Sequence, residues 1–543
     1  MDTKIAIIED NISKLSDIIG CTGIEYNNQT DDNLIHDWLV PKILELDEVE
    51  QLILPIRLGL DDADFKGLRI GLHIRLSVEL GDKRFLPLIF VAEENRELIL
   101  NNQIKGDKER SGMLLFTPGV YLTPISDLTY KLEKFKLTIT PEILVESVLP
   151  NLIIENQRDM GHQLANEWGV FRLAKFAGIQ LNIDLPRDLY FKYKYAHYET
   201  NIIPEPKSNI GLINLNNNCL LIDDNAEKGW SELLLQIMQK RILSIGKKCN
   251  FESIQSFEIA YNKSDYEKYD VIFLDLRLKP EEDKPNSVLP IEEFSGYKLL
   301  KKIKTINQGI QVIILTASNK AWNMKRLLDE GADGYYIKES PEFDFPDSFS
   351  KENYEGLKED IEKCLQRSYL KEIYKIWQST VDTISNPERN FIKESNSMLD
   401  IAWNLIHQEE LDFAYLTLFQ IIESYVNKKY DYRDNSIELE GMKSYMIEAN
   451  GDNEIWKLSF NRDNRNGDYF SSGNEQKSKR MRANTLYKAS CILKFNYNKD
   501  DAFLRKFGSL NDLRHKIAHE GSKGQVNTEN IKIVLEIIKM IRQ

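Results

Sequence analysis

The sequence predicts a multidomain protein with two doubly wound α/β domains followed by an all-helical C-terminal domain. Three observations support this fold class. The chain has 543 residues, which is too long for a single hydrophobic core. Short apolar runs rich in Ile, Val and Leu alternate with helix-length segments in two regions, residues 1–145 and 209–348. From residue 385 onward, apolar residues recur at spacings of three and four, as along amphipathic helices.

Composition and charge exclude several classes of protein. Apolar residues make up 42% of the chain and charged residues 29%, as in ordinary globular proteins. The net charge of −14 argues against a basic protein that coats nucleic acid. No apolar run is long enough to span a membrane, and the N-terminal residues lack the pattern of a signal peptide. The five cysteines are scattered without a CxxC pair, so we expect reduced thiols in a cytoplasmic protein.

The clearest α/β pattern lies in residues 209–348. The runs NNNCLLIDD, YDVIFLDLRL, IQVIILTAS and GYYIKES are typical of strands buried in a parallel sheet. In a doubly wound sheet, the carboxyl ends of the strands meet at one edge, where functional groups collect. The residues expected at this edge are Asp223, Asp224, Asp275, Thr316 and Lys338.

These side chains make chemical sense together. Three crowded carboxylates repel one another unless a hard divalent cation such as Mg²⁺ neutralises them. The cation and the Lys338 ammonium can hold phosphoryl oxygens while the Asp275 carboxylate attacks phosphorus. The Thr316 hydroxyl is placed to hydrogen-bond the new phosphoryl group. A phosphatase of the haloacid dehalogenase type is excluded, because Asp275-Leu276-Arg277 lacks the second Asp of a D-x-D pair.

This order of residues resembles the receiver domain of two-component response regulators, which has a flavodoxin-like fold. The resemblance implies that Asp275 is the phosphoacceptor, that it binds Mg²⁺ with Asp223 and Asp224, and that a histidine kinase or another phosphodonor is a partner. It also implies that Thr316 and Lys338 are the switch residues, with Tyr335 as the aromatic rotamer switch. The alternative interpretation is that the acids are ordinary solvated residues at strand ends.

Two features depart from the receiver pattern. The segment LKPEEDKPNSVLPIEEFSG, after the phosphoacceptor strand, is longer than in a compact receiver, and its acids are candidates for a lid over the site. Glu339 follows Lys338 where the family usually has a proline, so we expect a different shape for that loop.

Residues 1–145 repeat the plan in a degenerate form. KIAIIEDN resembles a first strand that ends in the acids Glu9 and Asp10, but Pro55 stands in the phosphoacceptor position, Ala92 in the Ser/Thr position and Thr123 in the lysine position. Because Pro and Thr cannot accept or clamp a phosphoryl group, we expect a pseudo-receiver used for docking or dimerisation. An unrelated α/β domain is the alternative. Residues 146–208 are expected to form a helical connector without chemistry, and residues 349–384 a linking helix.

The segment SLNDLRHKIAHEG carries the main signal of the C-terminal domain. Ser509 and Asp512 match a capping box, which predicts a short helix from Leu510 to a stop at Gly521. Arg514 and His519 on that helix lie five residues apart, so they flank a stripe rather than share one face. Two copies around a two-fold axis would bring both pairs into one groove.

An Arg-x4-His motif near the end of an all-helical domain resembles the HEPN superfamily, and RHKIAHEG is a close likeness within residues 385–543. The resemblance implies a dimeric, metal-independent endoribonuclease that needs no cofactor. His519 would transfer protons, Arg514 would stabilise phosphate charge and His515 would be an accessory group. Glu423 could orient a histidine. Many HEPN domains bind without cutting, and R-x4-H also occurs by chance.

The sequence therefore predicts a response regulator in which phosphorylation of Asp275 controls a C-terminal HEPN ribonuclease acting on RNA as a homodimer. The alternative is a non-catalytic signalling adaptor, whose HEPN helices only dimerise or bind RNA or protein. The basic cluster of Lys477, Lys479, Arg480 and Arg482 would contribute backbone attraction to RNA, or is a solvated loop.

Overall fold

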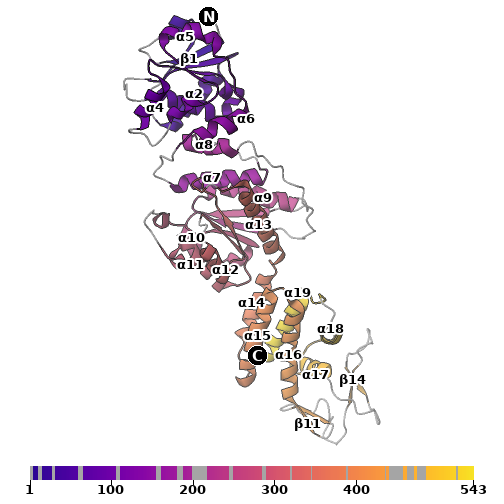
Figure 1. The fold of residues 1–543 in the computed structure, drawn as a ribbon. Helices are drawn as coiled ribbons and strands as arrows, with labels where there is room; N and C mark the ends of the chain where they lie inside the picture. The colour runs from indigo at the N-terminus through magenta and orange to yellow at the C-terminus, as the bar shows by residue number, and fades with distance from the viewer. Residues whose placement is uncertain are drawn as a thin grey trace.

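A computed structural model describes most of the chain (Figure 1). The described residues are 4–9, 15–26, 31–58, 65–104, 111–154, 161–179, 187–198, 217–243, 249–283, 289–317, 321–343, 345–386, 389–433, 436–439, 457–460, 470–473, 485–520 and 524–543. Asp10, Gly521 and the basic cluster of residues 477–482 lie outside them. Among the helices that are described, none has the length and apolar character needed to cross a membrane.

The front domain is a doubly wound parallel sheet, as the sequence predicts. Its strands lie in the order β2-β1-β3-β4-β5. They are β1 (Ile5–Glu9), β2 (Thr22–Glu25), β3 (Gln51–Pro55), β4 (Leu88–Val91) and β5 (Val120–Thr123). The helices are α1 (Leu15–Ile19), α2 (Asp32–Leu44), α3 (Lys66–Leu76), α4 (Arg96–Ile104), α5 (Ile125–Lys131) and α6 (Pro141–Ile143).

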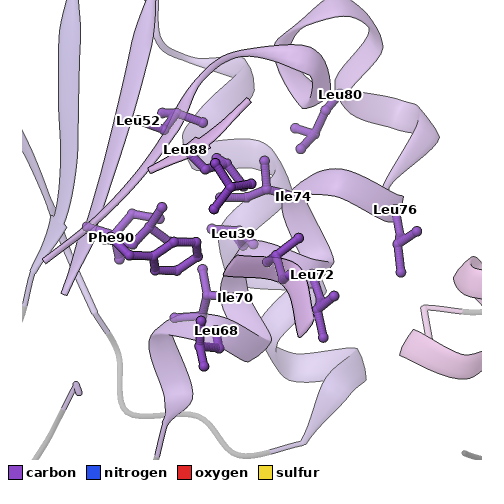
Figure 2. Packing of buried hydrophobic residues seen from close by; sticks show 14 of the residues in the cluster. Leu39, Leu52, Leu68, Ile70, Leu72, Ile74, Leu76, Leu80, Leu88 and Phe90 are labelled. Atoms are coloured by element: carbon purple, nitrogen blue, oxygen red, sulfur yellow. The ribbon is translucent and has the colours of Figure 1, made fainter. Parts of the chain in front are cut away.

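Alternation along these strands divides the core into two layers. Leu52, Leu88 and Phe90 face α2 and α3, where Figure 2 shows them packed toward Leu39 and Ile74. Ile53 and Ile89, one residue along, belong instead to the cluster that includes Leu15 of α1 and Leu128 of α5. Because successive strand side chains point to opposite faces, a run of apolar residues requires helices on both sides.

The second sheet has the same topology, β10-β9-β8-β6-β7. Its strands are β6 (Asn217–Ile222), β7 (Cys249–Ile254), β8 (Val271–Asp275), β9 (Val312–Thr316) and β10 (Gly334–Ile337). Its helices are α9 (Ser231–Leu243), α10 (Phe257–Asn262), α11 (Ser295–Ile306), α12 (Ala321–Asp329) and α13 (Asp347–Gln366). Every pairing is parallel, which confirms two receiver-like sheets.

The connector is a pair of helices that pack on different domains. Residues of α7 (Gly161–Phe176), such as Val170 and Leu173, join the core of the second sheet together with α9 and α13. Residues of α8 (Leu189–Tyr198), such as Leu189 and Ala196, join the core of the front domain. Trp168 and Phe191 form a small buried cluster shared by the two helices, which lie between the two sheets in Figure 1.

The C-terminal region is helical, with two exceptions to the sequence prediction. The helices are α14 (Leu370–Val381), α15 (Arg389–His407), α16 (Leu411–Lys429), α17 (Thr485–Phe495), α18 (Asp501–Glu520) and α19 (Thr528–Arg542). Two antiparallel hairpins, β11 (Tyr430–Arg433) with β12 (Ser436–Leu439) and β13 (Lys457–Phe460) with β14 (Phe470–Gly473), correct the expectation of an all-helical domain. The single linking helix is also wrong, because α13 ends at Gln366 and α14 belongs to the C-terminal core.

The predicted start of the Arg-His helix is wrong as well. Helix α18 begins at Asp501, not at Leu510, and Ser509 lies inside it with its Oγ donating to the Arg505 carbonyl at 3.2 Å. The cap is Asp500, whose Oδ1 accepts a hydrogen bond from the Phe503 amide at 2.8 Å. The S-x-x-D pattern therefore misled, because buried residues upstream of it continue the helical period.

Candidate functional site

Three aspartates converge at the carboxyl ends of β6 and β8. Asp223 follows β6 and Asp275 ends β8, and these strands are parallel neighbours with Ile222 opposite Leu274. Asp224 is half-buried beside them, whereas Asp223 is completely buried. One carboxylate oxygen from each of the three lies within 4.8 Å of the others. Parallel topology thus builds the acidic cluster that the sequence predicts.

Lys338, directly after β10, bridges two of these acids. Its Nζ donates to Asp223 Oδ2 at 2.8 Å and also to Asp275 Oδ2. Burial and the neighbouring Asp223 raise the pKa of Asp275 to about 7, although Lys338 opposes this shift. Burial lowers the pKa of Lys338, but attraction to the two carboxylates outweighs it and leaves the pKa above its ordinary value. Because one ammonium contacts only two of the three carboxyl groups, the cluster can still bind a second cation, and oxygen donors suit Mg²⁺.

The structure brings the switch candidates to the same edge. Thr316 ends β9 beside β8 and is buried, and its carbonyl accepts a hydrogen bond from the Lys338 amide at 2.7 Å. Tyr335 lies on the exposed face of β10, and Asp360 Oδ2 accepts a hydrogen bond from its amide at 3.1 Å. Thr316 is therefore part of the buried cluster, while Tyr335 is at its solvent side.

One acid of the loop after β8, Glu282, is not part of the expected lid over the site. Glu282 is buried and turns toward the start of α11, where it accepts hydrogen bonds from the Ser295 amide at 2.8 Å and the Ser295 hydroxyl at 2.7 Å. A carboxylate placed there satisfies amide groups that the helix leaves unpaired. Residues 284–288 of the loop lie outside the described residues.

Sequence reasoning missed two residues that surround Lys338. The Trp230 ring lies under the ammonium, with Nζ 4.8 Å from the ring centroid. Arg172 of α7 lies with its Nε 3.1 Å from the buried carboxylate of Glu339. The available signal for Arg172 was a charge inside the apolar stretch GVFRLAKF, which is unusual for an exposed helix face. No local pattern marks Trp230.

The front domain lacks the residues for this chemistry. Pro55 ends β3 as Asp275 ends β8, so no carboxylate occupies the phosphoacceptor position. Glu9 is buried at the end of β1, where it accepts hydrogen bonds from the amide and hydroxyl of Ser16. Glu9 is therefore engaged by its own domain.

Strand register refines one correspondence in that domain. In the front sheet, Pro55 is opposite Val91 and Val91 is opposite Thr123. In the second sheet, Asp275 is opposite Leu315 and Leu315 is opposite Tyr336. Thr123 therefore corresponds to Tyr336 and not to Lys338. The position level with Lys338 is Ile125, an exposed residue at the start of α5. The predicted Thr-for-Lys replacement is thus shifted by two residues, but neither side chain supplies a cation.

In the C-terminal domain, the Arg-His residues lie along the partly exposed side of α18. Arg514 Nη2 forms an ion pair with Glu423 Oε1 of α16 at 2.8 Å, so Glu423 contacts the arginine rather than orienting a histidine as expected. The rings of His515 and His519 stack with centroids 5.8 Å apart, and both residues are exposed. His515 thus lies between Arg514 and His519.

Comparisons with known proteins identify both α/β domains. A family described as "Inactive Receiver domain" matches residues 4–123. A family described as "Response regulator receiver domain" matches residues 220–345. The prediction of a degenerate front receiver and a complete second receiver is confirmed. A search of curated proteins found no match.

Similar solved structures are receiver domains with low sequence identity. A CheY-like receiver domain protein from Methanospirillum hungatei JF-1 is 19% identical, with 28% of this chain and 97% of that chain covered and a TM-score of 0.18. A two-component response regulator from Clostridium difficile is 20% identical, with 28% and 98% covered and a TM-score of 0.19. The HemR receiver domain from Leptospira biflexa is 20% identical, with 28% and 94% covered and a TM-score of 0.19.

The family matches and the acidic site together support a two-component-type regulator. Receiver domains of this class take phosphoryl groups from donors such as histidine kinases and bind Mg²⁺ at their acidic pocket.

Proposed function

We propose that this protein is a response regulator in which phosphorylation of Asp275 controls an endoribonuclease formed by residues 385–543. The observation that carries the first half is the Lys338 ammonium held between the carboxylates of Asp223 and Asp275. A cation already bound at that point can pair with an incoming phosphoryl group, because the group bears negative oxygens.

The transfer step uses the residues as follows. A carboxylate oxygen of Asp275 attacks phosphorus, the bond from phosphorus to the donor's leaving group breaks, and the leaving group departs with the electron pair. Mg²⁺, held by Asp223, Asp224 and Asp275, would neutralise charge on the phosphoryl oxygens. Lys338 then exchanges its contact with Asp275 for one with the phosphoryl group, and Thr316 donates its hydroxyl.

Acetyl phosphate tests this proposal directly. With Mg²⁺ present, the wild-type protein should gain the mass of one phosphoryl group in a base-labile adduct on Asp275. Asp275→Asn should lose the adduct because an amide is a poor nucleophile. Pro55→Asp added to the Asp275→Asn variant is a control that should not restore the adduct, because Ile125 stands at the level of Lys338 in the front domain. An unchanged wild-type mass, with a histidine kinase also failing as donor, would make the second receiver a scaffold.

The second half of the proposal assigns RNA cleavage to α18, and the resemblance to HEPN nucleases motivates it. His519 would take the proton from a ribose 2′-OH or give one to the leaving oxygen, with His515 beside it. Arg514 would stabilise charge on the phosphate. Purified protein should therefore cut RNA without a metal, spare DNA of the same sequence, and leave 2′,3′-cyclic phosphate ends.

One observation favours the adaptor function. Arg514 is already paired with Glu423, and this ion pair reduces the charge that it offers to a phosphate. A non-catalytic C-terminal domain would use the pair to hold α18 against α16. If total RNA stays intact with and without acetyl phosphate, the adaptor is the function. We further propose a homodimer. We also propose a cytoplasmic location, which is supported by four cysteines among the described residues that form no disulfide.

A further inference from the structure

Two helices outside the matched receiver hold the loop that carries Lys338. The loop runs from Lys338 to Pro341, and the helices are α7 and α8 of the connector. Arg172 of α7 contacts Glu339, and the Tyr190 hydroxyl of α8 donates to the Pro341 carbonyl at 3.3 Å. Contacts at both ends of a four-residue segment couple its position to these helices.

The Arg172 contact is buried and is part of a group of polar side chains. Its side chain is 1% exposed and that of Glu339 is 2% exposed. Besides Glu339 at 3.1 Å, Arg172 contacts Asp347 at 2.9 Å, and the Ser350 hydroxyl donates to the same Glu339 carboxylate at 2.7 Å. Breaking a buried ion pair by removing one partner leaves an uncompensated charge. The loop therefore cannot move far while Arg172 and α7 stay in place.

Helix α7 also packs against Trp230, the ring beside Lys338. At Gly169, an added Cβ would lie 3.1 Å from the Trp230 ring and 3.4 Å from the Glu339 carbonyl oxygen. Trp230 in turn lies under the Lys338 ammonium. One turn of α7 thus packs against both neighbours of the lysine that binds Asp275.

The contacts continue from α7 to the front domain. Phe191 of α8 packs edge-on against Trp168 of α7, with ring centroids 5.3 Å apart. The next residue, Lys192, donates to Ser77 Oγ at 2.8 Å and lies 3.1 Å from His73 Nδ1, both in the front domain. Packed aromatic rings and buried polar pairs therefore join the Lys338 loop to the inactive receiver.

We infer that Arg172 is a positioning residue that couples phosphorylation of Asp275 to the docking of the front domain, an inference that rests on the proposed phosphorylation. When a phosphoryl group draws Lys338 away from Asp275, Glu339 must follow, and its ion pair displaces α7 and then α8. Coupling is reciprocal, so the docking of α7 also affects the position of Lys338 and the extent to which Asp275 is phosphorylated at equilibrium.

Hydrogen exchange of the full chain, with acetyl phosphate and Mg²⁺, tests the inference. Phosphorylation should change amide exchange in α7 and α8 of the wild type by about tenfold, an ordinary size for coupling between sites. In Arg172→Met the response of α8 should weaken several-fold while the adduct on Asp275 still forms, because only the Tyr190 contact with Pro341 remains, and Arg172→Lys should restore part of the response. Arg326→Met is the control, because Arg326 pairs with Glu292 on the surface of the second receiver, away from α7 and α8, and its loss should leave the response intact.

The possible outcomes distinguish phosphorylation of Asp275 from its coupling to the front domain. Failure to form the adduct on Asp275 overturns the proposed phosphorylation and this inference with it. An adduct that forms in the wild type without changing exchange in α7 and α8 overturns the coupling alone. If Arg172→Met does not fold, Glu339→Gln decides, because glutamine keeps the hydrogen bonds and loses the charge. Glu339→Gln should weaken the exchange response and change the extent of phosphorylation at equilibrium, and behaviour equal to the wild type contradicts the inference.

Discussion

At the scale of single residues, a buried row of polar groups ties α8 to the front domain. Asp32 accepts two hydrogen bonds from Arg69, at 2.8 and 2.9 Å, and a third from His73 Nε2 at 2.9 Å. His73 Nδ1 is then free to accept from Lys192 at 3.1 Å. A neutral imidazole fits both contacts, because one ring nitrogen donates and the other accepts.

Titration of His73 should make the front domain sensitive to acid. Burial, together with Lys192, lowers the pKa of His73 to about 4 from an ordinary value of 6.5. Between these values the unfolded chain binds the extra proton and the folded chain does not, so the free energy of unfolding falls as pH drops. The loss should reach about 2 kcal/mol by pH 5. Urea unfolding at pH 7 and pH 5 measures this loss in the free energy of unfolding.

His73→Gln should flatten this pH dependence. Because burial lowers the pKa of His36 to about 4 as well, the variant should remove part of the dependence and not all of it. Equal slopes for the variant and the wild type would show that the titration lies elsewhere.

Glu423 should limit how strongly Arg514 attracts RNA. Both side chains are 22% exposed, so their ion pair contributes less than about 1 kcal/mol to stability. Glu423→Gln should keep the fold and tighten RNA binding a few-fold, with a steeper dependence on salt because Arg514 becomes available to phosphate. Fluorescence anisotropy with a labelled RNA measures this effect. Arg514→Ala should weaken binding, and tighter binding by both variants would contradict the role of Arg514.

At the scale of elements, the sequence predicts the features that depend on the local hydrophobic period and on the order of the strands. Both sheets were predictable because buried parallel strands read as short apolar runs, and Asp223, Asp275, Thr316 and Lys338 follow because parallel strands end at one edge. The start of α18 was not predictable from the sequence. Ser509 and Asp512 match a capping box, but buried Leu504 and Phe507 extend the helix upstream of them.

Contacts made by distant segments escaped prediction. Arg172 meets Glu339 across 167 positions of sequence, and no local pattern indicates that pairing. Lys192 meets His73 across 119 positions in the same way. Such pairs depend on how α7 and α8 pack after the sheets have formed, so a single sequence does not reveal them.

Arg367, in the break between α13 and α14, should help to hold the C-terminal domain in place. Arg367 donates to the His407 carbonyl at 2.6 Å and lies 3.3 Å from Glu409, both at the turn between α15 and α16. Arg367→Ala should loosen that attachment by about 1 kcal/mol, because a half-buried carbonyl loses its donor. Limited proteolysis near residue 367 should accelerate. Lys375→Ala is the control, since Lys375 forms an exposed pair with Glu267. Equal cleavage of both variants would contradict this role of Arg367.

At the scale of the whole molecule, the C-terminal domain attaches at the edge opposite the acidic cluster. Trp403 donates to Gln308 before β9 at 2.7 Å, and Lys371 contacts Asp270 before β8 at 2.7 Å. Asp275 and Thr316 lie at the other ends of these same strands. A phosphoryl group on Asp275 therefore cannot touch α18. Its effect must pass through α13, through the connector, or through a change in assembly.

Assembly can be tested through the stoichiometry of the proposed nuclease. One chain presents one Arg514 and one His519 on the same helix, five residues apart and so on different faces. His519→Ala should lower RNA cleavage by roughly two to four orders of magnitude, as expected when a proton-transfer group is lost. If both subunits of a dimer must supply His519, an equal mixture of wild type and variant should retain about one quarter of the wild-type activity, because only that fraction of random dimers is intact.

A surface variant provides the reference for that mixture. Lys532→Ala removes an ion pair with Glu372 on the other side of the same domain, and its equal mixture with wild type should keep nearly full activity. Activity of one half in the His519→Ala mixture would mean that each chain cuts alone. If the wild type cuts no RNA in either phosphorylation state, α18 is instead a contact surface, and substitution of Arg514 or His519 should then appear as monomers in sedimentation rather than as lost cleavage.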